Sequence, residues 1–265
     1  MAIDLRAQAR ELLICCDPTR KAALTRQLES TGQILPDARY TDTADIPGRP
    51  QRPALVGFNA LRRRSAATPQ GRAILLHALA HIEFNAINLA LDIVWRFPGL
   101  PEAFYRQWVS VAREEALHFE LLRAHLKTLG HDYGDFPAHD GLWEMAHKTR
   151  GDVLARLALV PRTLEARGLD AAPPLRDKLL AAGDTAAAEI LNIILRDEIG
   201  HVAVGNHWYR HLCTERGLDP IASYAELAAR HGAPRLRGPF NLPARRAAGF
   251  DEIELALLQA DNAAR

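Results

Sequence analysis

Two short segments of the sequence each carry a glutamate and a histidine three residues apart. They are Glu115 with His118 and Glu198 with His201, and both fall within long stretches of helical periodicity. Side chains at positions i and i+3 of a helix project from one face, so the carboxylate and the imidazole lie side by side. Each pair offers a metal ion one oxygen and one nitrogen ligand. The two segments therefore predict two metal-binding pairs on two helices.

Each pair is preceded by a further glutamate at almost the same distance. Glu83 lies 32 residues before Glu115, and Glu165 lies 33 residues before Glu198. A repeated set of Glu followed by Glu-x-x-His is the ligand set of four-helix bundles that hold two metal ions in their core. We therefore predict a dimetal site with six ligands: Glu83, Glu115, His118, Glu165, Glu198 and His201.

The positions of these glutamates favour metal binding over a structural role. Glu83, for example, lies in the middle of an apolar stripe that includes Leu76 and Ile87. An ionised carboxylate in a core costs several kcal/mol unless it is paired, and four such groups repel one another. Two divalent cations would neutralise all four. The alternative is that the glutamates lie at the ends of the bundle and pair with arginines.

A third Glu-x-x-His occurs at Glu144 and His147. It has no partner glutamate at the repeat distance, so we do not count it as a ligand pair. Glu114 and Asp197 directly precede the two ligand glutamates, and each could accept a hydrogen bond from the ring N–H of a ligand histidine. The alternative for both is a solvated charge on the helix surface.

Other residues near the ligand pairs are interpreted as packing residues. His77 and His81 lie off the helix face of Glu83, and Gly200 and Gly205 would give room for close contact between helices. Aromatic side chains at helical spacing usually fill a core, although they could also relay an electron. The aromatic residues concerned are Tyr105, Trp108, Trp208 and Tyr209.

Composition predicts an all-α protein that is soluble and cytoplasmic. Of the 265 residues 48% are hydrophobic, Ala and Leu are abundant, and strand signals are nearly absent. The net charge of +1 gives no general reason to expect nucleic acid or a membrane. We identify no signal-peptide core and no segment close to the roughly 18 uncharged apolar residues of a membrane span. Cys15, Cys16 and Cys213 make no zinc spacing and are expected to be reduced, partly buried thiols.

The expected architecture is a four-helix bundle with a long crossover and extra terminal helices. A connection at 131–150, with a short helix near Trp143, would join the second core helix to the third, which Pro161 should kink before it stops at Gly168. A small separate helix is expected at 174–182. The four core helices are expected at 68–97, 101–129, 152–167 and 184–216.

The regions outside the bundle are expected to pack against it. They comprise two N-terminal helices, at 4–16 and from Asp17, an acid-free arm, and C-terminal elements. The last helix should begin at Asp251, with Glu254 completing a capping box, after an irregular loop at 234–243. We thus expect three regions, 1–67, 68–217 and 218–265. The arm could hold RNA phosphates through its arginines: Arg49, Arg52, Arg62, Arg63, Arg64 and Arg72.

Several longer segments resemble a known family. The chain is similar to domain of unknown function 455 and, through its ligand pattern, to the ferritin-like superfamily of di-iron and di-manganese proteins. The resemblance implies a ferritin-like bundle and a dimetal site, and it implies no substrate. It rests on the segments PGRP (47–50), HALAHIE (77–83), EEALHF (114–119), YGDFPAHDGLW (133–143), LEARGLD (164–170), DEIGHV (197–202) and PFN (239–241).

These features lead to one preferred functional expectation. The protein would use two Fe or Mn ions, Fe being favoured, to activate O2 and to oxidise or hydroxylate an unknown small-molecule substrate. One alternative is a ferritin-like protein that binds or handles iron without substrate oxidation. A second is a tRNA-modifying hydroxylase that uses the basic arm, and a third is a structural bundle without metal. A dimer is compatible with the sequence.

Overall fold

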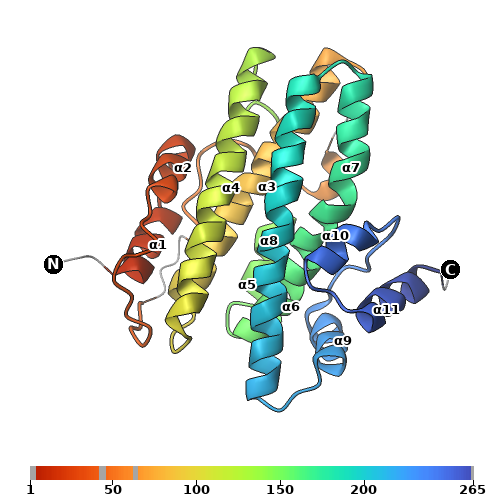
Figure 1. Cartoon of the computed structure of the whole chain (residues 1–265). Coiled ribbons are helices and arrows are strands. Elements are labelled where there is room, and N and C mark those ends of the chain that lie inside the picture. The colour runs from red at the N-terminus through yellow and green to blue at the C-terminus, as the bar shows by residue number, and fades with distance from the viewer. Residues whose placement is uncertain (1–3, 42–45, 62–64, 264–265) are drawn as a thin grey trace. The chain divides into compact units, whose positions relative to one another are not determined.

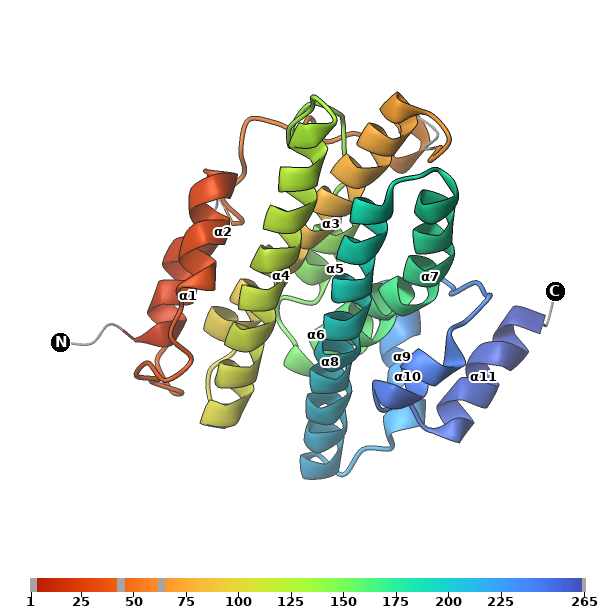
Figure 2. The ribbon, with the colours of Figure 1, turned by 45° about the horizontal axis from the view of Figure 1, so that its top comes forward.

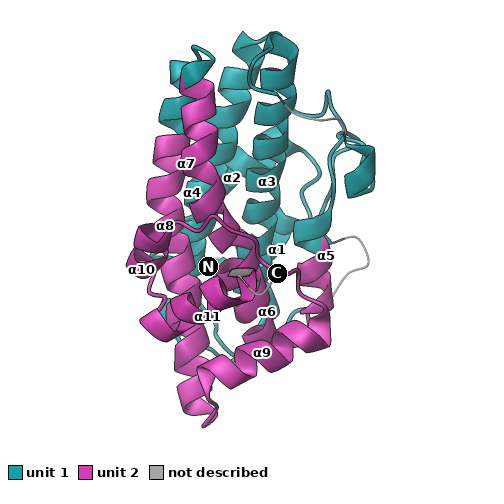
Figure 3. Cartoon of the chain, turned by 90° about the vertical axis from the view of Figure 1, so that its right-hand side faces the viewer, with its two compact units in different colours: residues 1–143, 181–190 teal, residues 144–180, 191–265 magenta. Residues whose placement is uncertain are grey.

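The computed structural model describes residues 4–41, 46–61 and 65–263, and within them the chain is all-helical. A single bridge between Leu55 and Ala138 is the nearest approach to a β-strand in these ranges. The chain forms two compact units, residues 1–143 with 181–190 and residues 144–180 with 191–265 (Figure 3). Three helices contribute residues to both units: α5 (Gly141–Lys148), α7 (Ala166–Ala181) and α8 (Thr185–Glu215).

The first unit is built on α3 (Pro69–Arg96) and α4 (Glu102–Thr128), which lie against each other (Figure 1). The Thr68 hydroxyl accepts a hydrogen bond from the amide of Gly71, and Pro69 occupies the first helical position, so α3 begins where a cap followed by proline predicts. The predicted ranges of both core helices are therefore confirmed.

The expectation that no segment comes close to the composition of a membrane span was wrong for α3. Its 28 residues have a window with a mean hydropathy of 1.4, so by length and composition alone this helix could cross a membrane. In the structure 83% of that window is buried within the protein. Because the core helix of a globular protein meets the same criteria, the apolar character of α3 is explained by the partners that cover it.

Two short N-terminal helices pack on this pair: α1 (Leu5–Leu13) contacts α3, and α2 (Pro18–Arg26) contacts α4 (Figure 1). The first of them ends three residues before the predicted end, so Cys15 and Cys16 lie in the turn that follows it. Cys16 is exposed, which corrects the expectation of a partly buried thiol there, whereas Cys213 is buried. All three cysteines are free thiols.

Lys21 in α2 is completely buried. Its Nζ donates to the backbone oxygens of Leu13 and Gly48, both at 3.0 Å, and to Oδ1 of Asn88 at 2.6 Å. Burial lowers the pKa of Lys21 from 10.5 to about 7, because the charged ammonium loses its water. This one side chain ties together α1, α2, α3 and the loop that carries Gly48.

The lowered pKa predicts a stability that depends on pH. Between about pH 7 and pH 10.5 the unfolded chain binds more protons at Lys21 than the folded chain does. The free energy of unfolding should therefore rise with pH across this window, by at most about 1.4 kcal/mol per pH unit. We expect urea unfolding to show this rise in the wild type relative to Lys21→Met between about pH 7 and about pH 9.5. If the difference in the free energy of unfolding between the wild type and Lys21→Met is the same at every pH, the three acceptors keep the ammonium of Lys21 charged in the folded protein.

The arm at residues 46–61 is held by the backbone of its neighbours. The amide of Gly48 donates to Leu13, and Ala138 exchanges backbone hydrogen bonds with Ala54 and Val56. Arg49 forms a bidentate ion pair with Asp140, with N–O distances of 3.0 and 2.6 Å. Further along, Nε of Arg72 lies 3.7 Å from the carboxylate of Asp184. The predicted RNA-binding residues Arg62, Arg63 and Arg64 lie outside the described residues.

In the second unit, α5 is followed by α6 (Val153–Leu159), a π-helical segment (Val160–Glu165) and then α7. The predicted stop at Gly168 and the separate helix at 174–182 were wrong, because α7 continues through Gly168, Pro173 and Pro174. A glycine inside a helix costs about 1 kcal/mol, and burial of other α7 side chains such as Leu169 offsets that cost. The expected irregularity at Pro161 takes the form of the π-helical segment.

Part of α8, together with α7 and α10 (Leu242–Ala247), forms a small core in this unit. Ala166 and Leu169 of α7 meet Val202 of α8 and Ala244 of α10. Figure 2 shows α7 and α10 beside α8. The helix α10 lies partly within the predicted irregular loop 234–243, so that expectation was wrong at its end. Asn241 caps α10 by accepting a hydrogen bond from the amide of Ala244.

The two glycines of α8 differ in their surroundings, which gives a matched pair of variants. A Cβ added at Gly205 would lie 2.6 and 2.8 Å from the ring carbons of Pro161, whereas one added at Gly200 would meet nothing within 4 Å. Gly200→Ala should therefore stabilise the protein by about 1 kcal/mol through helix propensity. Gly205→Ala should destabilise it by about 1–2 kcal/mol through overpacking. Urea unfolding measures the free energy of unfolding of both variants. Equal changes in the two variants would exclude the expected clash between a side chain at position 205 and Pro161.

Two C-terminal helices begin directly after an aspartate that caps them. The helix α9 (Pro220–His231) begins after Asp219, and α11 (Glu252–Ala263) begins after Asp251. The amide of Glu254 donates to Oδ1 of Asp251 at 2.9 Å, and the amide of Asp251 donates to Oε2 of Glu254 at 3.0 Å. These reciprocal bonds confirm the predicted capping box. The carboxylate of Glu254 also pairs with Arg162 of the π-helical segment, which joins α11 to that segment.

Candidate metal centre

Three of the predicted ligands converge in the first unit. Nδ1 of His118 lies 3.3 Å from Oε2 of Glu83 and 3.4 Å from Oε2 of Glu115. Glu83 is 5% exposed, and the other two side chains are completely buried. Each offers one ligand atom, and these atoms all lie within 4.8 Å of one another. Two facing helices, α3 and α4, thus bring two carboxylates to one imidazole nitrogen.

The electrostatics of this cluster favour positive charge. Burial by itself lowers the pKa of His118, but hydrogen bonds and charge interactions with Glu115 and Glu83 outweigh burial and raise the pKa to about 11. The imidazole is therefore held as a cation that balances part of the carboxylate charge. Because Nδ1 faces both carboxylates, a divalent cation at this position would take the place of that proton.

The second unit repeats the Glu-x-x-His arrangement on α8. Glu198 is 7% exposed and His201 is 1% exposed, and Nδ1 of His201 lies 3.7 Å from Oε1 of Glu198. The carboxylate and the imidazole therefore lie side by side and away from solvent, as their spacing predicts. Within the described ranges, four buried side chains have ligand atoms that could hold metal ions: Glu83, Glu115, His118 and Glu198.

The sixth predicted ligand has a different setting. Glu165 is half-buried and is the last residue of the π-helical segment Val160–Glu165. Single π-helical turns are rare and occur frequently at functional sites, because the extra residue changes the direction in which side chains project. The sequence predicted a disturbed helix near Pro161 but gave no sign that the disturbance would extend to Glu165.

The predicted outer carboxylates are both half-buried. Asp197 accepts two hydrogen bonds from its neighbour Arg196, at 2.7 and 3.0 Å, so at least part of its charge is balanced on the helix surface. A role for Glu114 or Asp197 in orienting a ligand histidine stays a prediction. Glu144 and His147 are exposed, which agrees with their exclusion as a ligand pair.

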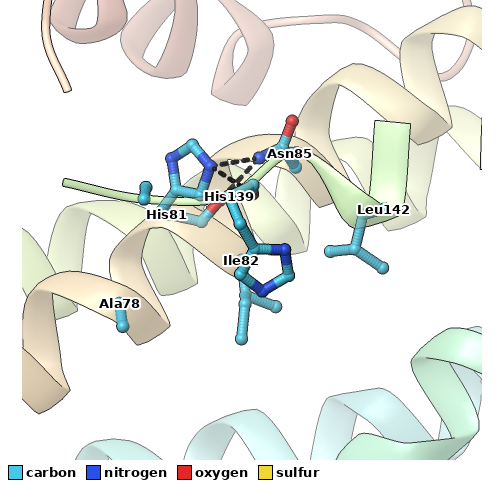
Figure 4. Close-up of a pocket in the computed structure, with 7 residues that line it drawn as sticks. Ala78, His81, Ile82, Asn85, His139 and Leu142 are labelled. Carbon is cyan, nitrogen blue, oxygen red and sulfur yellow. Dashed lines mark hydrogen bonds between the residues drawn. The ribbon is translucent and has the colours of Figure 1, made fainter. Parts of the chain in front are cut away.

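His77 and His81 are structural histidines, as predicted. Nδ1 of His81 shares a hydrogen bond of 2.9 Å with the Tyr133 hydroxyl, and the amide of Gly134 donates to Nε2 of His77. Burial lowers the pKa of His81 to about 4, so the ring is neutral. Figure 4 shows His81 and Asn85 at a small cavity. The part played by Tyr133 was missed, because this residue lies in a connection without periodicity.

The aromatic residues near the ligand pairs fill the core, as predicted. Tyr105, Trp108, Trp208 and Tyr209 are all at most 4% exposed. The hydroxyl of Tyr105 donates to the backbone oxygen of Phe97 at 2.8 Å, and that of Tyr209 donates to Pro220 at 2.7 Å. Both phenols thus have a backbone partner in addition to their packing contacts.

These observations define an all-helical protein with buried carboxylate and imidazole side chains that could bind metal. Residues 14–256 match the family described as "Protein of unknown function (DUF455)", and the chain belongs to that family. It is also similar to an uncharacterised protein of Haemophilus influenzae (strain Rd), with 47% identity over 264 residues that cover 94% of this chain and 91% of the relative. No solved structure matches the chain.

Proposed function

We propose that the protein is a dimetal oxidoreductase with a ferritin-like four-helix bundle at 68–217. The observation that carries this proposal is the convergence of the Glu83 and Glu115 carboxylates on Nδ1 of His118, at 3.3 and 3.4 Å in a buried setting. A core that holds this much negative charge needs cations to balance it. Buried carboxylates and imidazoles on facing helices are the usual means by which helical bundles bind two metal ions.

The proposed second half of the site is formed by Glu165, Glu198 and His201. Support comes from the repeated spacing along the chain and from the burial of Glu198 and His201 on α8. The π-helical segment that ends at Glu165 adds a second, independent indication. With all six ligands, four carboxylates would neutralise two divalent cations, and one imidazole would hold each ion.

The donor set favours iron or manganese, and iron first. Mixed carboxylate and imidazole ligands suit these ions better than they suit Cu(I) or structural zinc, both of which favour thiolates. When bound, two such ions would supply O2 activation and the oxidising power for a small-molecule substrate. The chain itself would bind and orient the ions through its carboxylates, exclude bulk water by burying the ligands, and keep Nδ1 of His118 directed at Glu83 and Glu115.

The experiment is a measurement of metal content in protein purified without a metal-binding tag. Elemental mass spectrometry should find about two Fe or Mn ions per chain in the wild type. His118→Ala and His201→Ala should each lose metal. His147→Ala is the matched control, because His147 belongs to the exposed third Glu-x-x-His and its loss should leave the metal content unchanged.

Two further results decide between functions. Fe(II) added to metal-depleted protein under anaerobic conditions, followed by O2, should lead to O2 uptake that both His→Ala ligand variants lose. Iron binding far beyond two ions per chain would instead favour the iron-handling alternative. A folded protein that binds no metal after reconstitution with Fe(II) and Mn(II) would overturn the proposal.

A further inference from the structure

We propose a second metal site on the solvent side of α8, formed by His207 and His211 with Glu215 as a third ligand. These residues follow one another at intervals of four, so they lie along one helix face. All three belong to the second unit, and none is among the six ligands of the proposed dimetal centre. The ligand class is a borderline divalent ion such as Zn²⁺, Cu²⁺ or Ni²⁺.

The two imidazole rings are neighbours on this helix face and lie stacked, so rotation about their side-chain bonds is needed to turn one nitrogen of each ring toward a shared ion. Their centroids are 6.3 Å apart, and their planes differ by 17°. An ion about 2.1 Å from one nitrogen of each ring lies about 3 Å from each ring centre. Two rings can therefore share it when their centres are up to roughly 6 Å apart. His207 is exposed, so its ring is free to rotate out of the stack and direct a nitrogen at the ion.

The third ligand is in place beside His211. Oε1 of Glu215 lies 3.3 Å from Nε2 of His211, and the two side chains are 56% and 35% exposed. The carboxylate would fix the tautomer of this ring, or would join the ion directly after a rotation of its own flexible side chain. Two nitrogens and one oxygen on successive turns of one helix therefore lie within reach of a single ion after these rotations.

The surroundings leave room for an ion and its remaining water ligands. His207 and His211 line a hollow of about 400 Å³ between α8 and the segment 247–249. The nearby guanidinium of Arg210 is held by the carboxylate of Glu254, which also pairs with Arg162, and by the backbone oxygen of Gly249. A cation in the hollow thus meets the two imidazoles, and the carboxylate of Glu215 lies one turn further along the helix.

The chemistry of this site differs from that of the buried centre. Imidazole-rich sites prefer late transition ions, whereas carboxylate-rich sites also accept Mn²⁺ and Mg²⁺. The exposed position allows rapid exchange with metal in solution. We therefore expect the site to bind Cu²⁺ and Zn²⁺ even when the buried centre already holds its ions or has lost a ligand.

The fluorescence of Trp208 should report metal binding at His207 and His211 directly. Its ring centroid lies 4.9 Å from that of His207 and 5.1 Å from that of His211, so bound Cu²⁺ should quench its fluorescence. We expect Cu²⁺ titration of the whole protein to quench one component of the emission, with an affinity that falls at least about tenfold in His207→Gln and in His211→Gln. Zn²⁺ calorimetry should show the same losses without depending on fluorescence.

Controls separate this site from the buried centre and from single histidines. His118→Ala should keep the quenching, and His231→Gln, which removes a histidine outside the pair, should leave it unchanged. Trp208→Phe should lose the quenching but keep Zn²⁺ binding. Unchanged Cu²⁺ and Zn²⁺ affinity in both folded His207 and His211 variants would overturn the proposal, as would quenching that disappears only in His118→Ala.

Discussion

Replacing Glu115 by glutamine should remove the stabilisation that metal gives to the folded protein. A ligand that binds only the native state at 100 to 1,000 times its dissociation constant adds about 3–4 kcal/mol to the free energy of unfolding. The wild type should gain this increment when Fe(II) or Mn(II) is added to depleted protein. Glu115→Gln should gain almost none, because a neutral amide is a far weaker ligand for a hard cation than a carboxylate.

The same variant should behave differently when metal is absent. In depleted protein the carboxylates of Glu83 and Glu115 share the charge of a single imidazolium at His118. Removing one of two buried like charges relieves repulsion and desolvation, so Glu115→Gln should be at least as stable as the depleted wild type. The effect of the substitution therefore changes sign with metal.

Thermal or urea unfolding with and without metal measures both effects, and Glu144→Gln provides the control. Glu144 occupies the equivalent position in the exposed third Glu-x-x-His, so its variant should keep the full metal increment. Equal destabilisation by Glu115→Gln in depleted and loaded protein would show that Glu115 has a structural role alone.

Features that depend on local sequence were predicted well. The boundaries of α3, α4 and α8 follow from apolar periodicity together with Thr68, Pro101 and Asp184 at their starts, and the capping box at Asp251 follows from residue types three apart. The burial of Glu83, Glu115 and Glu198 also followed from their positions in apolar stripes. In these cases a few neighbouring residues contain all the information that is needed.

The errors concern features in which distant parts of the chain decide the outcome. Gly168 and Pro173 usually end helices, but the side chains of α7 that they separate are buried by α8 and α10, and this packing outweighs local preference. Tyr133 meets His81 across 52 residues, and no periodic pattern marks such a contact. Arg6 and Lys21 belong to residue types that are usually solvated, yet both are completely buried.

Arg6 carries the largest expected loss of stability among the residues outside the metal centre. Its guanidinium makes five hydrogen bonds to backbone oxygens, and its centre lies 4.8 Å from the centroid of the Tyr105 ring. Two of the acceptors belong to the last turn of α3, whose carbonyls have no partner within the helix. The five acceptors are the backbone oxygens of Leu35, Pro36, Ala38, Val94 and Trp95.

Arg6→Met should therefore destabilise the protein by about 3–5 kcal/mol, because five backbone carbonyls, two of them in buried hydrogen bonds, lose their donor while the methionine fills most of the volume. Arg10→Met is the matched control on the same helix. Among the described residues, Arg10 forms its ion pair with its exposed neighbour Glu11, so its loss should cost no more than about 0.5 kcal/mol. Urea unfolding followed by circular dichroism measures both variants.

Arg6→Lys tests whether charge or hydrogen-bond geometry accounts for the loss. Lysine keeps the positive charge but has three donors on a single nitrogen, whereas arginine spreads five donors over a planar fork. If the fork is what joins the end of α3 to residues 35–38, the lysine variant should lose most of the stability that Arg6→Met loses. Wild-type stability in Arg6→Lys would assign the effect to charge. A loss in Arg6→Met no larger than that in Arg10→Met would exclude a role for the buried guanidinium in holding this unit together.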